Sequence, residues 1–364
     1  MTKARIGIIG AGFWAATHYL PLFHGHSDVE LVGIVRKSDE GLDAVKRTFE
    51  LEVATSSVEE LLAHDLDGVV VSSPHGLHRE HAVAALAAGA HVLVEKPMTI
   101  HLADAKAIVT EAQLHGLTAT VAHGWNYSRM ATWAHDVLAA GELGRITSVT
   151  GYMASCLTEL FSGRSGYGVE DVGGFAVEAE PDTWARADAG GGYLYGQLSH
   201  LLGLALWLFP KDPEEVFARA HLLDNGVDLD VQVSVAFGDG TIGSFCGHGH
   251  QPWVMRHACD LRIAGENGVL ALDFERERAE LLLQGDRGRG EVVHVLPEPP
   301  PADGEGMYEC DGPAQHLIDI CLRRETQDCA PAEVGMRSVA VMEGAWRSIH
   351  AGQAVQVEEL RTAR

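Results

Sequence analysis

The sequence predicts an α/β protein with an N-terminal doubly wound parallel sheet and a C-terminal α/β domain that contains antiparallel strands. Three observations carry this prediction. Apolar, β-branched segments alternate with helical segments over the first third of the chain, as in parallel sheets. A glycine-rich turn follows the first of these segments. The second half instead contains strand pairs joined by short turns. Because 364 residues suit about two domains, we place them at 1–124 and 125–364.

The charge of the chain excludes several kinds of partner. Acidic residues (51) outnumber Lys and Arg (27), and the formal net charge is -24. Such a surface repels nucleic acid and anionic lipid, so we expect no nucleic-acid or membrane partner. The longest apolar run, Leu198 to Phe209, is too short to cross a bilayer. Six scattered cysteines without a Cys-x-x-Cys pair, and an N-terminus without a leader pattern, predict a cytoplasmic protein with reduced thiols.

The first strand and the turn after it form the first candidate site. Arg5 to Ile9 is predicted to form a strand and is followed by Gly10-Ala-Gly12-Phe-Trp-Ala15 and a helix through residues 17–22. The first glycine suits a tight turn, the second allows a pyrophosphate to approach the backbone, and Ala15 allows close helix packing. The predicted cofactor contacts in this turn are Gly10, Gly12, Phe13 and Trp14.

The second strand, Glu30 to Val35, predicts which dinucleotide binds. Recognition of the NAD ribose usually needs an acid after this strand, but Arg36, Lys37 and Ser38 stand there. Two cations and a hydroxyl suit a 2'-phosphate, so we expect NADP(H) to be favoured, with NAD(H) possible. The alternative is an ordinary exposed basic pair after a strand.

The next strand, Gly68 to Ser73, ends in Ser73-Pro74-His75-Gly-Leu-His78, and a helix follows to Ala88. We assign Ser73, Pro74, His75 and His78 to the cofactor site. His75, His78 and His81 have a spacing that metal sites also use, but no cysteine or acid completes the set. The pair His248 and His250 is interpreted as surface histidines. The sequence therefore predicts no metal site.

The strand His91-Val-Leu-Val94 leads directly into Glu95, Lys96 and Pro97. Lys96 thus follows the carboxyl end of a strand, which is where ligands bind in open α/β sheets. A half-buried lysine near another cation could hold or relay a proton near neutral pH. The alternative is a solvated ion pair of Glu95 and Lys96.

The rest of the chain predicts a substrate loop and a sheet built from hairpins. The long irregular segment 155–190, which carries Trp184, is interpreted as the substrate loop. The remaining predicted elements are helices at 58–63, 102–115, 130–140, 315–323 and 333–350, strands at 117–122 and 145–154, a crossover at 123–127, and hairpins at 231–245 and 259–274.

The stretch from Gly190-Gly-Gly192 to His200 is the second informative segment. On an α-helix, Tyr193, Gln197 and His200 share one face with Gly196, which would form a polar stripe opposite Lys96. The alternative is a tyrosine and a histidine satisfied within a core helix.

The order of these motifs resembles the Gfo/Idh/MocA family, the group of glucose-fructose oxidoreductase and inositol dehydrogenase. The matching motifs are Gly10-x-Gly12, Ser73-Pro74-x-x-x-His78, Glu95-Lys96-Pro97, and Gly190-Gly-Gly192 followed by a histidine. The resemblance covers nearly the whole chain and is tightest in its first third. It implies a Rossmann domain, a C-terminal domain with a large, mostly antiparallel open sheet, and an active site between them. It also implies a homo-oligomer, a dimer or tetramer, that uses the exposed sheet face.

The resemblance further implies roles for individual residues. Lys96 would bind the reacting hydroxyl or carbonyl, Glu95 would contact the cofactor ribose or the lysine, and the Lys96-Pro97 bond would be cis. His75 stands where an asparagine is often found. Gly196 stands where many relatives have an aspartate that orients the histidine. We therefore expect His200, with Lys96, to move the substrate proton, and Tyr193 to be the substitute donor. The predicted substrate contacts are Lys96, Asn126, Trp184, Gln197 and His200.

Together these features predict an enzyme that transfers hydride between NADP(H), or less favourably NAD(H), and a secondary alcohol or ketone of a sugar, polyol or related metabolite. Two alternatives stay open. One is a glycosidase that oxidises its substrate transiently with tightly held NAD. The other is a non-catalytic, dinucleotide-sensing regulator on the same fold.

Overall fold

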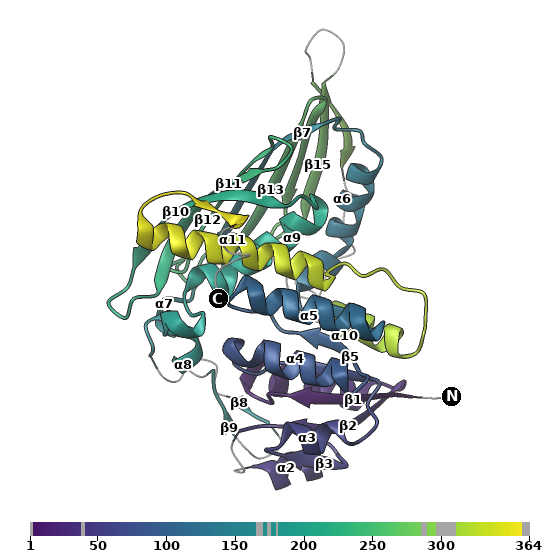
Figure 1. Ribbon diagram of the computed structural model, residues 1–364. Helices are drawn as coiled ribbons and strands as arrows, with labels where there is room; N and C mark the ends of the chain where they lie inside the picture. Colours follow the sequence, from purple (N-terminus) through teal and green to yellow (C-terminus); the bar gives the residue numbers. More distant parts are fainter. Residues whose placement is uncertain are drawn as a thin grey trace.

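The structure is a computed structural model that describes residues 3–37, 41–164, 170–172, 176–179, 181–284, 290–295 and 311–358. Two large sheets organise these residues, one in the lower and one in the upper part of Figure 1, and a third sheet has only two short strands. In the described part of the chain, no helix is both long enough and apolar enough to cross a membrane.

The first sheet is parallel and has the strand order β3-β2-β1-β4-β5-β6. Apolar β-branched side chains fill its central strands, and Val69, Val70 and Val71 are all buried because helices cover both faces. The predicted doubly wound sheet is confirmed. Its strands are β1 (Ala4–Ile9), β2 (Val29–Val35), β3 (Val53–Thr55), β4 (Gly68–Val71), β5 (His91–Val94) and β6 (Ala119–Val121).

Helices from both ends of the chain cover this sheet. The N-terminal ones are the π-helix η1 (Ala15–Tyr19), α1 (Leu20–Gly25), α2 (Leu42–Thr48), α3 (Val58–Leu62), α4 (His78–Ala87) and α5 (Leu102–His115). Helix α10 (Asp311–Cys321) also packs here, since Leu317 and Ile318 share a core with Ile6 and Ile8. The sequence did not predict that the C-terminal part returns to the first sheet, and the boundary at 124/125 stays a prediction.

The second sheet has nine strands in the order β16-β15-β14-β13-β7-β12-β11-β10-β17. Its pairs are antiparallel except β12 with β7, and the two predicted hairpins are confirmed as β11 with β12 and β13 with β14. Its strands are β7 (Ile146–Ala154), β10 (Pro213–Leu222), β11 (Asp228–Phe237), β12 (Ile242–His248), β13 (Ala258–Gly265), β14 (Gly268–Asp273), β15 (Arg278–Gln284), β16 (Gly290–Val295) and β17 (Val355–Gln356).

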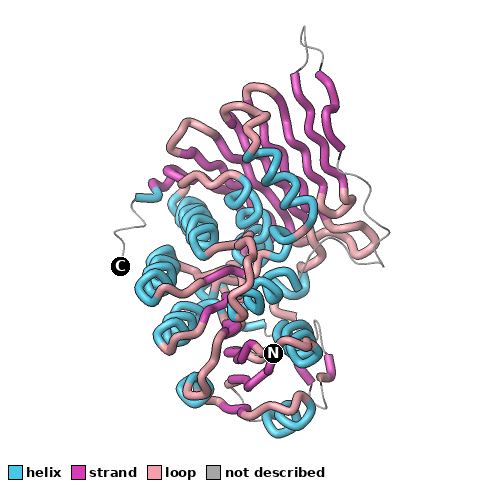
Figure 2. The backbone as a smooth tube through the Cα atoms, turned by 90° about the vertical axis from the view of Figure 1, so that its right-hand side faces the viewer, coloured by secondary structure: helices cyan, strands magenta, loops and turns pink. Residues whose placement is uncertain are grey.

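Helices cover one face of the second sheet, as Figures 1 and 2 show. Helix α9 (Ser199–Leu208) lies on β7 and β13, α6 (Arg129–Ala139) packs on α9, and α11 (Ala332–Ala351) lies on β10 and also contacts α5 of the first layer. The strands alternate between buried and exposed residues. In β11, Val231, Val233 and Val235 are buried, whereas Gln232 and Ser234 point to the exposed face.

The segment between the sheets contains short elements where an irregular loop was predicted. These are α7 (Thr158–Phe161), β8 (Glu170–Asp171), β9 (Ala176–Val177), α8 (Pro181–Trp184) and the 3-10 helix η4 (Ala187–Ala189). The π-helix η5 (Leu194–Leu198) follows and leads into α9. Two further 3-10 turns, η2 (His75–Leu77) and η3 (Gly124–Tyr127), lie after β4 and β6.

Candidate active site

The glycine turn after β1 has the geometry that a dinucleotide requires. Gly10 has φ +95°, and a Cβ there would lie 2.3 Å from the Ser73 nitrogen, so only glycine fits. A Cβ on Gly12 would meet no atom of the described residues within 4 Å. The turn lies between β1 and β4, where the strand order reverses and where cofactors bind in this fold. Half-buried Phe13 and Trp14 begin the following helix. The residues present therefore fit a dinucleotide.

The basic residues predicted to bind a 2'-phosphate follow β2 directly. The Arg36 nitrogen donates to the Thr55 carbonyl oxygen at 3.1 Å, which holds this turn against β3. Arg36 is half-buried and Lys37 is exposed, whereas Ser38 lies outside the described residues. In the described part of this turn no acid takes the place usual for NAD.

His78 contacts both the loop after β4 and the loop after β5. It is fully buried, with Nε2 2.7 Å from the carbonyl oxygen of Ser73 and Nδ1 3.0 Å from that of Pro97. Burial lowers its pKa to about 4, against the effect of those carbonyls. The side chain thus holds Ser73-Pro74 against the loop of Lys96, and a direct contact of His78 with the cofactor stays a prediction. The Ser73 hydroxyl itself lies 2.8 Å from His81 Nδ1.

Glu95 is buried beside Lys96. The Tyr19 hydroxyl donates to its Oε1 at 2.6 Å, and the Lys96 backbone nitrogen donates to its Oε2 at 3.1 Å. Burial raises the pKa of Glu95, whereas the charge of Lys96 and the Tyr19 hydrogen bond oppose that rise. The Lys96-Pro97 bond is cis, as the resemblance implied. The solvated ion pair considered from the sequence is excluded for Glu95, which is only 7% exposed.

Lys96, which follows β5 of the first sheet, contacts the segment that leads into α9. Its Nζ donates to the Gly196 carbonyl oxygen at 3.0 Å and lies 5.4 Å from the centre of the Trp184 ring. That ring meets His75 edge to face, with 5.1 Å between centroids, and His75 Nδ1 lies 3.2 Å from the Gly190 carbonyl oxygen. The structure thus brings the predicted residues Lys96, His75 and Trp184 together, although they lie far apart in the sequence.

Three buried imidazoles surround this lysine: His75, His123 and His200. Burial lowers the pKa of each, for His123 to about 3, and the charge of Lys96 lowers each further. They are therefore neutral near pH 7 and able to accept a proton. The sequence reasoning missed His123. The available signal was its position directly after β6, beside the strand that carries Lys96.

Tyr193 does not share the face of His200. Its ring lies against Gly247 and Gly249 of the second sheet and meets Phe161 edge to face at 6.2 Å. The π turn η5 adds a residue to the helical turn, so the predicted α-helical stripe is wrong. Burial also raises the pKa of Tyr193 far above its usual range. This placement does not support Tyr193 as the substitute proton donor.

Asn126 has a structural role, and its predicted contact with substrate stays a prediction. Its Nδ2 donates to the Cys329 carbonyl oxygen at 2.8 Å and approaches that of Gly203 at 3.4 Å, and the side chain is fully buried. It therefore ties the segment before α11 to helix α9. Gln197 is half-exposed on η5, and its contact with substrate stays a prediction.

Gly196, which stands where many relatives have an aspartate, is tightly packed in this chain. A Cβ on Gly196 would lie 3.0 Å from the Phe161 ring and 3.2 Å from that of Trp184. The two aromatic rings thus occupy the space that a carboxylate would take.

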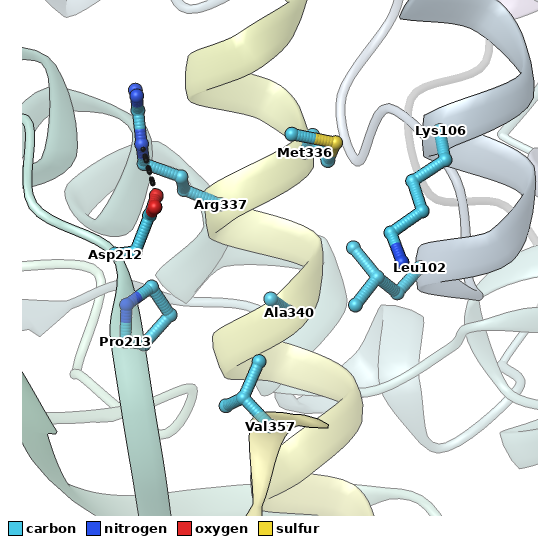
Figure 3. A pocket seen from close by; sticks show the side chains of 8 residues that line it. All are labelled: Leu102, Lys106, Asp212, Pro213, Met336, Arg337, Ala340 and Val357. Atoms are coloured by element: carbon cyan, nitrogen blue, oxygen red, sulfur yellow. Dashed lines mark hydrogen bonds and ion pairs between the residues drawn. The ribbon is translucent and has the colours of Figure 1, made fainter. Parts of the chain in front are cut away.

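A pocket elsewhere in the described structure is unrelated to this cluster. It lies between α5, α11 and β10, with the Arg337–Asp212 ion pair on one side and Lys106 and Met336 on the other (Figure 3). None of its lining residues belongs to the predicted site, so the chemistry is assigned to Lys96 and its neighbours.

Comparison with known families agrees with this geometry. Residues 4–123 match a family described as the Gfo/Idh/MocA oxidoreductase family with an NAD-binding Rossmann fold, and residues 132–271 match the Gfo/Idh/MocA C-terminal domain. The chain belongs to the Gfo/Idh/MocA family. It is thus an oxidoreductase with an NAD-binding Rossmann domain, which confirms the predicted family, fold class and enzyme class.

Several relatives in this family have known activities or structures. The 1,5-anhydro-D-fructose reductase of Ensifer adhaerens is 26% identical over 362 residues, covering 97% of this chain and 98% of that protein. The levoglucosan dehydrogenase of Pseudarthrobacter phenanthrenivorans is 25% identical over 336 residues, covering 85% and 84%. A levoglucosan dehydrogenase solved with NADH and L-sorbose superposes with a TM-score of 0.76 at 21% identity, covering 98% and 99% of the two chains. That structural likeness supports the fold.

Proposed function

We propose that this protein transfers hydride between a nicotinamide dinucleotide and a secondary alcohol or ketone of a sugar, polyol or related metabolite. The observation that carries this proposal is the meeting of Lys96 with buried, neutral histidines at the carboxyl edge of β5, beside the glycine turn. When bound, the nicotinamide supplies the hydride acceptor or donor. Gly10, Gly12, Phe13, Trp14, Arg36, Ser73 and Glu95 would hold the dinucleotide.

The residues around Lys96 would handle the substrate oxygen and its proton. The ammonium of Lys96 would hydrogen-bond to the reacting oxygen, and His200, neutral because it is buried beside that charge, would take the hydroxyl proton during oxidation. In the direction of reduction, the imidazole of His200 would return the proton to the substrate oxygen. Trp184, at the end of α8, would cover the site, since its ring already lies over Lys96.

The carbohydrate character of the substrate rests on the relatives. A reductase of 1,5-anhydro-D-fructose, a glucose-6-phosphate 3-dehydrogenase and a levoglucosan dehydrogenase are named among them. The test is a spectrophotometric screen of aldoses, ketoses, anhydrosugars and polyols with both dinucleotides. For an active substrate, we expect Lys96→Met and His200→Ala to lower kcat by about 10²- to 10⁴-fold. Lys211→Met, a change of a half-exposed lysine paired with Asp239, is the control and should retain activity.

This screen also separates the alternatives. Cofactor retained through purification, with glycoside cleavage and no net NAD(P)H, would point to the glycosidase. If the protein binds a dinucleotide and Lys96→Met changes none of the measured properties, the result would point to the regulator. Full activity of Lys96→Met would contradict the proposed chemistry.

We infer a preference for NADP(H) from Arg36 and Lys37 after β2. One charged hydrogen bond to a 2'-phosphate contributes about 1.5–3 kcal/mol, which is roughly tenfold to a hundredfold in affinity. Calorimetry should therefore give tighter binding of NADPH than of NADH, and Arg36→Ala with Lys37→Ala should remove the difference while leaving NADH affinity nearly unchanged. Equal or tighter NADH binding by the unmodified protein would refute this preference; a related structure was solved with NADH.

We also infer a cytoplasmic homo-oligomer. Five cysteines in the described residues (156, 246, 259, 321 and 329) are free thiols, which suits a reducing compartment. The face of the second sheet opposite the helices offers an extended surface for a second copy. Light scattering after size exclusion should give a dimer or tetramer mass, and a monomer at micromolar concentration would contradict the inference.

A further inference from the structure

The face of the second sheet away from the helices carries a histidine and aspartate cluster that the proposed reaction does not use. Strand register creates it: His221 of β10 lies opposite Asp230 of β11, and Asp230 lies opposite His248 of β12. Directly opposed residues point to the same face of a sheet, so three neighbouring strands place His, Asp and His side by side. His250 follows two residues later, and its ring stacks on that of His248 with 4.4 Å between centroids.

We propose that Asp230, His248 and His250 form a binding site for a divalent transition metal ion of the Zn²⁺ class. One ligand atom from each of the three residues lies within 4.8 Å of those of the other two. His250 Nδ1 lies 3.3 Å from Asp230 Oδ1. Two ligands on a tetrahedral Zn²⁺, each at about 2.0–2.1 Å, are about 3.4 Å apart, so this pair already has the separation that a shared ion requires.

The hydrogen bond of His248 permits its metal-binding form: when Nε2 donates to the Tyr152 hydroxyl, Nδ1 keeps the lone pair that binds an ion. The Tyr152 hydroxyl lies 3.0 Å from His248 Nε2, which leaves Nδ1 as the atom turned toward the cluster. That Nδ1 is buried and has no hydrogen-bond partner among the described residues. Metal-bound histidines commonly hold their second ring nitrogen in such a hydrogen bond, which fixes the tautomer and the ring orientation.

The carboxylate of Asp230 is oriented in the same way. His221 Nδ1 lies 3.2 Å from Oδ2, the oxygen that does not face His250. Two imidazole nitrogens and one carboxylate oxygen are a ligand set that suits Zn²⁺, Co²⁺ or Ni²⁺ and suits Mg²⁺ or Ca²⁺ poorly. A water molecule, or His221 after a rotation, would complete four-coordination. A bound ion would link β11, β12 and the start of the loop at 249–257.

The test measures Zn²⁺ binding to the full chain without an affinity tag, after treatment with a chelator. Calorimetry and metal analysis should give one tight Zn²⁺ per chain, and Co²⁺ in its place should give the visible bands of a low-symmetry site. His248→Ala and His250→Ala should each weaken Zn²⁺ binding at least tenfold, and Tyr152→Phe by about tenfold or more. His250 is half-exposed in a loop, so its variant decides the matter if His248→Ala does not fold.

The matched control is His64→Ala. His64 Nδ1 lies 3.3 Å from Glu52 Oε2, the same separation as between His250 Nδ1 and Asp230 Oδ1. Among the described residues, no third ligand completes a metal site there. This variant should keep the stoichiometry and affinity of the unmodified protein. Absence of stoichiometric Zn²⁺ binding at 100 μM would overturn the proposal. So would an unchanged Zn²⁺ affinity of His250→Ala, whether or not His248→Ala folds.

Discussion

His123 makes a quantitative prediction about acid stability. It is fully buried between Lys96 and helix α9, and its ring presses so closely on Gly203 that a Cβ there would lie 2.5 Å from it. Burial, aided by the charge of Lys96, lowers its pKa from 6.5 to about 3. Between these two values the unfolded chain binds a proton at this residue and the folded chain does not. The free energy of unfolding therefore falls as the pH drops below about 6.5.

The size of this effect follows from the pKa difference. A pH of 5 is about 1.5 units below the pKa of His123 in the unfolded chain, where the residue is therefore protonated, whereas in the folded chain it is still neutral. Between pH 7 and pH 5, His123 therefore lowers the free energy of unfolding by about 2 kcal/mol. His123→Phe and His123→Gln both remove this titration. Both also remove the two buried ring nitrogens, which have no hydrogen-bond partner in the described structure, but Gln puts a polar amide in their place and Phe does not.

The assay is urea unfolding of the unmodified protein and the two variants at pH 7 and pH 5. We expect both variants to lose about 2 kcal/mol less than the unmodified protein on acidification, and His123→Phe to exceed His123→Gln in stability at pH 7 by about 1 kcal/mol or more. An identical loss in all three proteins would refute the assignment of a buried, neutral His123.

Three further predictions concern the glycine turn, the interlayer tie and the lysine contact. Gly10→Ala should abolish dinucleotide binding by calorimetry, because its Cβ would meet Ser73 at 2.3 Å in a left-handed conformation; retained affinity would contradict this. Asn126→Leu should lower the free energy of unfolding by about 1–3 kcal/mol, because the Cys329 carbonyl loses its donor, and unchanged urea stability would count against it. Gly196→Asp should lower turnover rather than restore the family pattern, since Phe161 and Trp184 fill that space; a more active variant would disprove the steric argument.

Local sequence patterns were sufficient for most elements of the fold. Apolar β-branched runs predicted five of the six parallel strands, all but the short β3, and helix α5 was predicted with its observed bounds. Alternating residues around short turns predicted both hairpins. These features depend on residues near one another in the chain. The glycine turn and Lys96 were also readable, because each directly follows a strand and the carboxyl edge of a parallel sheet collects such positions.

Only the tertiary structure decided which side chains meet. The π turn at Leu194–Leu198 turned Tyr193 toward the sheet, and packing gave His78 and Asn126 structural roles, because burial and hydrogen-bond partners come from distant segments. His123 lies near Lys96 because β5 pairs with β6. Asp230 lies beside His248 because the register of β11 and β12 places them opposite each other. The sequence by itself determined the elements and the cofactor turn, whereas strand register and layer packing, which act over long separations, determined the sites.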